Sequence, residues 1–385
     1  MTFIPLSVPN MGKKEAEYVN GAVVTGWVSS VGTYVSRFED ELSAYTGLPG
    51  AVACQSGTAA LHLAMISMGI SGGDMVIVPS FTFIAAVNPV RYLGAAPIFM
   101  DCDDSLCMDP AKLRSFCEEC CFVKNKTLYH RDTGKRIPLV VVVHVFGNMA
   151  DMEAIMEVAG EFHLMVLEDA SEAIGTIYKD GIYRNKMAGT IGDIGVYSFN
   201  GNKIITTGGG GMAVSGDPDR LKHIRYLSTQ AKDDEVYFIH NEIGYNYRMT
   251  NVQAAIGVAQ LERLESFIGV KTANFHLYEL LLDDISGLSF VQMRAGTRPN
   301  YWMYGLLLPC AEHRDQLLKK LEGEKIQTRP AWGLIHDQKP YVNDLAYKIE
   351  KARYYVERIL NIPCSSGLTP DEVHRVSGCI RALYA

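Results

Sequence analysis

The sequence has no excess of positive charge and no long apolar segment. Its 385 residues include 36 Lys and Arg against 43 Asp and Glu, which gives a formal net charge of −7. Nucleic-acid-binding proteins usually carry basic patches, and no long basic run is present, so we expect no nucleic-acid partner. The longest apolar runs, such as 139–143, are far shorter than the roughly 20 residues that span a bilayer. We therefore expect no membrane partner either.

The start of the chain does not resemble a secretory signal. Residues 1–6, Met-Thr-Phe-Ile-Pro-Leu, lack the basic start and the long apolar core of a signal peptide. From this we expect a soluble, cytoplasmic protein.

The nine cysteines do not form a pattern typical of disulfides or of a metal site. Cys117, Cys120 and Cys121 cluster on a predicted helix, and the other cysteines are scattered. A zinc site would need a second cluster with matching spacing, and none follows. We predict buried or half-buried free thiols and no bound metal.

Between about residues 50 and 215, apolar segments alternate with helical patterns. The segment 139–144 is rich in valine and apolar on both faces, as the strands of parallel sheets are. The alternation predicts an α/β fold with a mostly parallel central sheet. We expect strands at 51–54, 75–78, 96–100, 139–144 and 164–167, and helices at 57–68, 85–93, from 110, and at 150–162.

The chain is longer than one ordinary domain. A long helix is predicted at 251–267, and further helices at 314–322 and 347–359. We predict a large domain over residues 1–260, including an N-terminal segment, and a smaller C-terminal α/β domain over residues 261–385. The polar insertion within 120–138 is expected to form a surface hairpin or loop.

Three candidate site residues follow predicted strands, at the edge where ligands of such sheets bind. Thr58 stands at a helix start, where free backbone N–H groups suit a phosphate. Phe83 could stack on a flat cofactor ring, and Asp169 could bind a ring nitrogen. Each has a plain alternative: a capped helix, a core aromatic residue, and an acid that caps the next helix. A dinucleotide site is not expected, because residues 55–60 lack Gly-x-Gly-x-x-Gly.

Lys203 stands between an apolar strand and four consecutive glycines, 208–211. A surface lysine is the plain alternative, but the flanking apolar residues indicate burial, which can free the amine to attack an aldehyde. Ser198 and Asn200 are polar groups within reach. Together with Asp169, Lys203 suggests a site for a carbonyl cofactor, in which the lysine forms a Schiff base.

Five segments, in order, resemble the DegT/DnrJ/EryC1/StrS sugar aminotransferases, pyridoxal-phosphate enzymes of fold type I. The resemblance extends from about residue 27 to residue 336, nearly the whole chain. The segments read SGTAAL (56–61), PSFTF (79–83), EDASE (168–172), GDIGVYSFNGNK (192–203) and GYNYRM (244–249).

The resemblance implies a role for each matching residue. Lys203 would form the Schiff base with pyridoxal 5′-phosphate, Asp169 would pair with the pyridine nitrogen, and Phe83 would stack on the ring. Asn246 would reach the phosphate of the neighbouring subunit, which implies a homodimer with shared active sites. The phosphate cup would consist of Gly57, Thr58 and Ser198, with Asn200 nearby.

Two positions depart from the common family pattern. Glu172 stands where many members carry glutamine beside the ring hydroxyl, and Gly209 stands where many carry glutamate. The glycine run, the opening residues 3–9 and the segment that begins at Trp27 look most like the LegC branch. That branch implies transfer of an amino group from L-glutamate to C4 of a UDP-linked 4-keto-6-deoxy-N-acetylhexosamine, on the way to legionaminic-acid-type sugars.

A nucleotide-linked keto-sugar carries a diphosphate, so an acidic protein needs a local cationic patch. Candidate substrate-binding residues are Trp27, Arg184, Lys186, Arg248, Arg329 and His336. Trp332 could pack on a uracil or sugar ring, although a core position is the alternative.

Other substrates and one other role stay open. The same scaffold accepts GDP- or dTDP-linked keto-sugars and cyclitols. Dehydratase relatives carry histidine at the Schiff-base position, and Lys203 argues against that chemistry. A non-catalytic, cofactor-binding regulatory relative would tolerate the loss of Lys203 or Asp169, and both are present.

Overall fold

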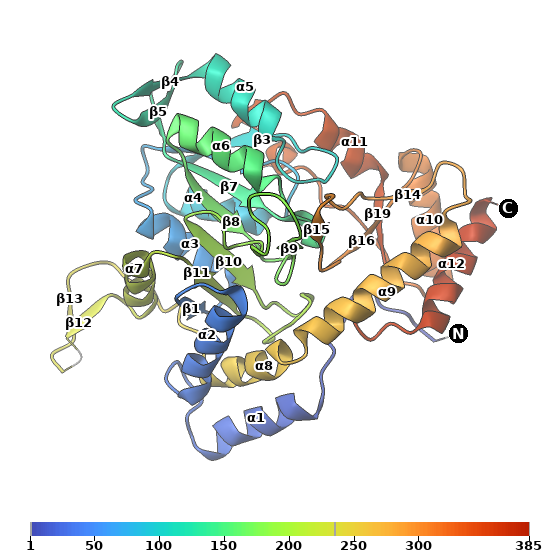
Figure 1. Ribbon diagram of the computed structural model, residues 1–385, viewed down its shortest axis with the longest axis horizontal. Helices are drawn as coiled ribbons and strands as arrows, with labels where there is room; N and C mark the ends of the chain where they lie inside the picture. The colour runs from blue at the N-terminus through green and yellow to red at the C-terminus, as the bar shows by residue number, and fades with distance from the viewer. Residues whose placement is uncertain (1, 235, 385) are drawn as a thin grey trace.

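The computed structural model describes residues 2–234 and 236–384, and its centre is an eight-stranded mixed sheet (Figure 1). Seven of these eight strands run in the same direction, and β11 runs in the opposite direction. The predicted α/β fold with a mostly parallel sheet is confirmed. In spatial order the strands are β1 (Ala51–Cys54), β11 (Gly211–Val214), β10 (Ile194–Ser198), β8 (Met165–Asp169), β7 (Leu139–Val143), β2 (Met75–Pro79), β3 (Ala96–Met100) and β18 (Leu345–Tyr347).

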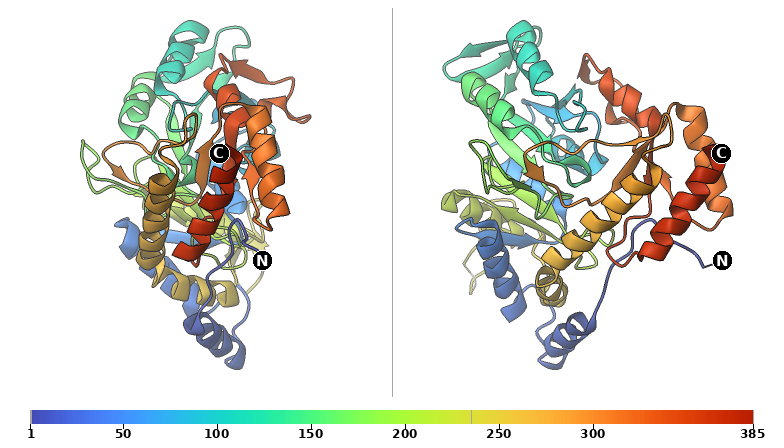
Figure 2. Two further views of the ribbon diagram at one scale, coloured as in Figure 1. Left: turned by 90° about the vertical axis from the view of Figure 1, so that its right-hand side faces the viewer. Right: turned by 45° about the vertical axis from the view of Figure 1, so that its right-hand side comes forward.

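Helices cover both faces of this sheet, which explains why its central strands are apolar throughout (Figures 1 and 2). All residues of β7 and β2 are buried. One face carries α3 (Gly57–Ser67) and α4 (Asn88–Tyr92), and the other carries α5 (Pro110–Cys120) and α6 (Met152–Phe162). This is the arrangement that right-handed crossovers between parallel strands produce, because the chain passes from β2 to β3 in one direction and from β7 to β8 in the other.

Three predicted helices differ from the structure at their ends. The helix expected at 85–93 is a short 3₁₀ turn, η1 (Ile84–Ala86), followed by α4, because Pro89 lies in the first turn of α4. The helix expected at 251–267 is divided into α8 (Asn251–Leu261) and α9 (Leu264–Leu282). The helix expected at 347–359 is only α11 (Lys351–Arg358), because Tyr347 pairs with Met100 in the sheet.

The C-terminal part contains a second, antiparallel sheet, seen on the right of Figure 1. Its strands, in spatial order, are β14 (Ser289–Phe290), β16 (Tyr304–Leu307), β19 (Ile359–Ile362) and β17 (Arg329–Pro330). The helices α9, α10 (Ala311–Gly323) and α12 (Pro370–Tyr384) pack beside it. The division into residues 1–260 and 261–385 stays a prediction. The two parts exchange segments: β18 completes the central sheet, and Ile4 forms a bridge with Ile326.

The insertion at 120–138 forms a small three-stranded sheet, so the expected surface hairpin is confirmed. Its strands are β4 (Cys121–Lys124), β5 (Thr127–His130) and β6 (Arg136–Ile137). Cys121 therefore begins a strand and does not lie on the helix with Cys117 and Cys120. A second hairpin, β12 (Lys232–Asp234) and β13 (Ile239–His240), projects from the body of the molecule on the left of Figure 1.

The other helices and short strands connect the layers described above. Within the described ranges, every helix falls short of the length or hydrophobicity that crossing a membrane requires. The remaining elements are α1 (Lys13–Val24), α2 (Thr33–Thr46), α7 (Pro218–Ser228), β9 (Ile177–Tyr178), β15 (Thr297–Arg298), η2 (Val145–Gly147) and η3 (Ile335–Asp337).

Candidate active site

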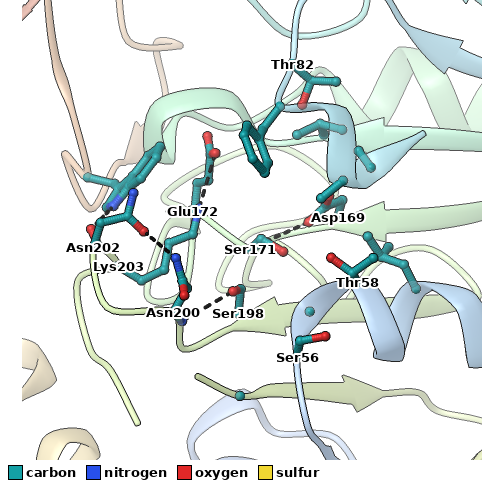
Figure 3. Close-up of a pocket in the computed structure, with 18 of the residues that line it drawn as sticks. Ser56, Thr58, Thr82, Asp169, Ser171, Glu172, Ser198, Asn200, Asn202 and Lys203 are labelled. Atoms are coloured by element: carbon teal, nitrogen blue, oxygen red, sulfur yellow. Dashed lines mark hydrogen bonds and ion pairs between the residues drawn. The ribbon is translucent and has the colours of Figure 1, made fainter. Parts of the chain in front are cut away.

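A cavity of about 340 Å³ opens at the carboxyl ends of the central strands (Figure 3). Val143, Asp169 and Ser198 end the neighbouring strands β7, β8 and β10 and line the cavity. Parallel strands bring these chain-distant residues to one edge of the sheet. The cavity wall is completed by the start of α3, by Lys203, and by Trp302 and Trp332 from the C-terminal part.

The start of α3 forms one end of the cavity. Ser56 caps the helix, because its Oγ accepts a hydrogen bond from the backbone N–H of Ala59 (3.0 Å). The N–H groups of Gly57 and Thr58 have no acceptor within the described ranges. A Cβ atom at Gly57 would lie 2.9 Å from Cβ of Ser198, so the helix approaches β10 closely. Free N–H groups at a helix start, beside hydroxyl groups, suit a phosphate dianion.

Asp169 lies at the buried floor of the cavity. Its side chain is only 5% exposed, and its Oδ1 accepts a hydrogen bond from the backbone N–H of Ser171 (3.0 Å). Burial raises the pKa of Asp169, although the hydrogen bonds from Ser171 and the charge of Lys203 oppose this effect. A desolvated carboxylate of this kind binds a cationic N–H donor strongly. A protonated ring nitrogen is such a donor.

Lys203 enters the same cavity from the loop between β10 and β11. Its Nζ lies 3.3 Å from Oε1 of Glu172 and 3.9 Å from the ring centre of Trp302. The other carboxylate oxygen of Glu172 accepts a hydrogen bond from the backbone N–H of Phe146 (2.9 Å). Burial raises the pKa of Glu172, and the nearby Lys203 charge counteracts it. The lysine and Asp169 thus share one cavity, as the sequence predicts (Figure 3).

A buried pair behind the cavity fixes the end of β8. The backbone N–H of Ala150 donates to Nδ1 of His144 (3.1 Å), so the ring proton lies on Nε2, which is 2.9 Å from Oε2 of Glu168. Glu168 also accepts hydrogen bonds from the backbone N–H groups of Gly189 and Ile191. These donors satisfy a fully buried carboxylate and hold the adjacent Asp169 in place.

The structure brings together most of the residues predicted to bind the cofactor. Their roles in binding stay predictions, but their positions agree with one shared site. The cavity is lined by Gly57, Thr58, Phe83, Asp169, Glu172, Ser198, Asn200 and Lys203.

Asn246 does not line this cavity. It is exposed, and its backbone forms a bridge with Thr229 on the outside of the chain. An exposed asparagine is accessible to a second copy of the chain, so the predicted contact across subunits stays a prediction.

The predicted substrate-binding residues also lie outside the cavity of this chain. Arg248 donates to Glu39 and to the carbonyl oxygen of Ala53, so both of its terminal nitrogens already have acceptors inside the chain. His336 places Nδ1 2.6 Å from Oγ of Ser80 and Nε2 2.9 Å from Arg353. Exposed positions outside the cavity are occupied by Trp27, Arg184, Lys186 and Arg329.

Of the two tryptophans at the cavity, Trp302 is missed by the sequence analysis, and Trp332 is given there only as a residue that could pack on a substrate ring. Trp302 lies about one hundred positions from Lys203, and no local pattern connects the two. Trp332, for which a core position is the alternative, is half-buried and has its ring centre 6.2 Å from that of Phe83. The rarity of tryptophan, with three in the chain, is the signal that could have marked both residues.

The chain is similar in sequence to a known family of enzymes. The sequence profile of the DegT/DnrJ/EryC1/StrS aminotransferase family matches residues 9–381. The chain is 37% identical to GDP-perosamine synthase from Caulobacter vibrioides, covering 97% of this chain and 96% of the relative. It is 36% identical to GDP-perosamine synthase from Escherichia coli O157:H7, over the full length of both.

A solved structure agrees with the fold. The aminotransferase TlmJ from Streptoalloteichus hindustanus superposes with a TM-score of 0.88 at 27% identity, covering 99% of this chain and 98% of that one. The matching profile, the whole-length relatives and this structure lead to one conclusion. The chain belongs to the DegT/DnrJ/EryC1/StrS family of aminotransferases, which have fold type I and use pyridoxal 5′-phosphate as their cofactor.

Proposed function

We propose that this aminotransferase moves an amino group from L-glutamate to C4 of a UDP-linked 4-keto-6-deoxy-N-acetylhexosamine, in the biosynthesis of legionaminic-acid-type sugars in the cytoplasm. The observation that carries amino transfer is the single cavity that Lys203, Asp169 and the start of α3 share. The UDP-linked acceptor rests on the LegC-like segments of the sequence.

The residues of the cavity fit pyridoxal phosphate in three places. The N–H groups of Gly57 and Thr58, which have no acceptor among the residues that the structure describes, suit the phosphate together with the Ser198 hydroxyl. Asp169 is a buried acceptor suited to a ring N–H, and Phe83 on the wall suits a flat ring. Lys203 is the amine that an aldehyde in this cavity would meet. Bound there, the cofactor supplies an electron sink for the pair released at the α-carbon of the donor.

The side chains then have separate tasks. Asp169 holds a proton on the ring nitrogen, because a desolvated carboxylate favours a cationic partner. The Lys203 amine takes the proton from the α-carbon of glutamate and later returns one to C4 of the sugar. Such positioned acid–base catalysis contributes about 10²–10⁴-fold to the rate. Glu172 orients the Lys203 amine through its Oε1.

A GDP-linked keto-sugar is the second candidate acceptor. Two relatives of 36% and 37% identity over essentially their whole length are named GDP-perosamine synthases. Their similarity favours a GDP-linked acceptor as strongly as the LegC-like segments favour a UDP-linked one, so both belong in the same assay.

We also propose a homodimer with shared sites. Asn246 is exposed beside the hairpin of β12 and β13, where several large apolar side chains are more than half exposed. An exposed apolar group of this size is typical of a protein interface. These side chains, which we call the hairpin patch, are Val236, Tyr237, Phe238 and Ile243.

Two measurements test the proposed function. Borohydride reduction of the purified protein should attach a pyridoxyl group to the peptide that contains Lys203, and Lys203→Ala should abolish both this adduct and amino transfer. A panel of UDP-, GDP- and dTDP-linked 4-keto-sugars, assayed with glutamate for 2-oxoglutarate release, should identify the acceptor. An adduct on another lysine would overturn the assignment of Lys203, and turnover of the GDP-linked sugar alone would replace the UDP-linked acceptor.

A further inference from the structure

The Lys203 amine contacts only one of the two buried carboxylates that line the cavity. Its Nζ lies 3.3 Å from Oε1 of Glu172. Burial raises the pKa of Asp169 and the charge of Lys203 only partly offsets this effect, and within the described residues the two side chains form no hydrogen bond. Asp169 is thereby left free for another partner. The question is what keeps the amine on the Glu172 side of the cavity.

Trp302 is the second contact of this amine. The Nζ atom lies over the face of the indole ring, 3.9 Å from the ring centre. Tryptophan is the best aromatic partner for a cation, and the attraction is larger when both groups are desolvated. Here Trp302 as a whole is 2% exposed and the lysine side chain 11% exposed, so the contact lies largely out of water.

The indole ring is fixed relative to the loop that carries the lysine. Its Nε1–H donates to the carbonyl oxygen of Asn202 (2.8 Å), the residue directly before Lys203. On the other side, the backbone N–H of Trp302 donates to Oδ1 of Asn300 (2.9 Å). One hydrogen bond holds the indole nitrogen and the other holds the backbone of Trp302, so the ring has a fixed position against which the lysine side chain packs.

We propose that Trp302 is a positioning residue, which forms with Glu172 a seat that holds the released Lys203 ammonium away from Asp169. The inference rests on the proposed role of Lys203 as the amine that leaves and rejoins the cofactor. The seat keeps the free amine at a fixed point between its two proton transfers. It also leaves the Asp169 carboxylate for the ring nitrogen.

The three tryptophans of the chain permit a direct test of the contact. In the cofactor-free Trp27→Phe/Trp332→Phe protein, Trp302 is the only source of tryptophan fluorescence. Lys203→Met in this background should change its emission maximum, because a charge over the ring face is removed. Lys124→Met, at an exposed position on β4, should leave the emission unchanged. Unchanged emission after Lys203→Met would overturn the proposal.

The second test measures the freedom of the amine. Trace acylation of the cofactor-free protein, followed by peptide mass analysis, gives the labelling rate of Lys203 relative to Lys124. We expect Trp302→Leu to raise this rate by about five- to thirtyfold and Trp302→Phe by less, because the smaller ring keeps a weaker cation–π contact. Trp332→Leu opens the same cavity and removes the ring stacked on Trp302, 6.3 Å away between ring centres, but it keeps the contact between Trp302 and Lys203. It should therefore change the rate by less than about twofold.

The outcomes separate the seat from a simple opening of the cavity. Equal rates in the Phe and Leu variants, or equal rates in the Trp302→Leu and Trp332→Leu variants, would overturn the proposal. If Trp302→Leu does not fold, the Phe variant and the fluorescence test decide it. Neither measurement uses substrate, so a failure of the sugar assay would not alter these results, and a failed seat would leave amino transfer standing.

Discussion

At the scale of single residues, the cavity combines two buried carboxyl groups with one lysine. Both carboxyl groups have a pKa raised mainly by burial, above ordinary values of 3.8 for Asp169 and 4.5 for Glu172. The folded, cofactor-free chain therefore binds protons that the unfolded chain has already released. The contribution of these two groups to the free energy of unfolding therefore decreases as the pH rises from about 4 through their raised pKa values.

This sign predicts the behaviour of Asp169→Asn. The amide cannot ionise, so the variant should gain stability relative to the cofactor-free wild type as the pH rises from about 5 to about 8. Thermal denaturation across this range measures the difference. Asp104→Asn is the control, because Lys351 lowers the pKa of Asp104 below its ordinary value of 3.8. This group is ionised in both the folded and the unfolded chain above about pH 5, so its removal should change the stability by a constant amount across this range. Parallel curves for Asp169→Asn and wild type would contradict the prediction.

The sequence indicates some of these residues and not others for a physical reason. Lys203 and Asp169 stand in contiguous segments whose apolar neighbours reveal burial, so their positions could be predicted. Trp302 reaches the cavity only because the C-terminal part folds back over the central sheet. Arg248 has the charge expected of a substrate contact, but the buried partner Glu39, far away in the sequence, uses that charge inside the chain.

At the scale of elements, the contact between β11 and the start of α3 determines the shape of the phosphate end. A Cβ atom at Gly211 would overlap the backbone of Ser56 and Gly57, whereas one at Gly209 would meet its nearest neighbour, Gln253, at 3.9 Å. The four glycines therefore differ in how strictly they are required.

We expect Gly211→Ala to destabilise the protein by about 1–3 kcal/mol, as overpacking in a core typically does. It should also weaken cofactor binding, because α3 must shift. Gly209→Ala is the matched control in the same run and should be near neutral in stability. Urea denaturation and cofactor titration measure the two effects. Equal stability of the two variants would argue against a tight approach of β11 to α3.

The carboxylate of Glu39 joins α2 to β1 and to the loop before α8. It accepts hydrogen bonds from the backbone N–H of Ala53 (2.6 Å) and from Arg225 (3.0 Å), and it also binds Arg248. Glu39→Ala would leave the largely buried Arg248 unpaired, at a cost of about 3–5 kcal/mol. Glu41→Ala, which removes an exposed partner of Arg37, should cost at most about 1 kcal/mol. Similar denaturation midpoints for the two variants would refute this difference.

The predicted boundaries of helices and strands agree with the structure where residues close in the sequence determine them. They differ where contacts between distant segments determine them. The core strands 75–78 and 139–144 are predicted well because burial on both faces requires continuous apolar runs. The helix expected from 347 starts later, because pairing with β3 commits Tyr347 to a strand. The long helix expected at 251–267 breaks before Leu264, where Arg263 bonds to Asn10 and Glu15 of the N-terminal segment.

At the scale of the whole molecule, the proposed homodimer makes the hairpin patch a testable surface. The native mass should be twice the 42.5 kDa of the chain. Ile243→Asp, at a position 85% exposed, should shift the protein toward the monomer and reduce cofactor retention, because a charge is costly within an apolar interface. Light scattering after gel filtration measures the mass.

Leu280→Asp provides the control for this experiment. Leu280 is also highly exposed but lies on α9, away from the hairpin, so its substitution should leave mass and cofactor retention unchanged. A wild-type protein that elutes as a monomer and still retains its cofactor would refute the shared site.

The position of β18 late in the sequence has a consequence for folding during synthesis. The edge of β3 stays uncovered until residue 347 of 385 has left the ribosome, since β18 is the strand that seals it. A nascent chain of 260 residues already contains every other strand of the central sheet. One backbone edge of the apolar strand β3 is nevertheless exposed, and a strand of another chain can pair with it. A chain cut at residue 260 should therefore aggregate even though it contains the seven other strands of the central sheet.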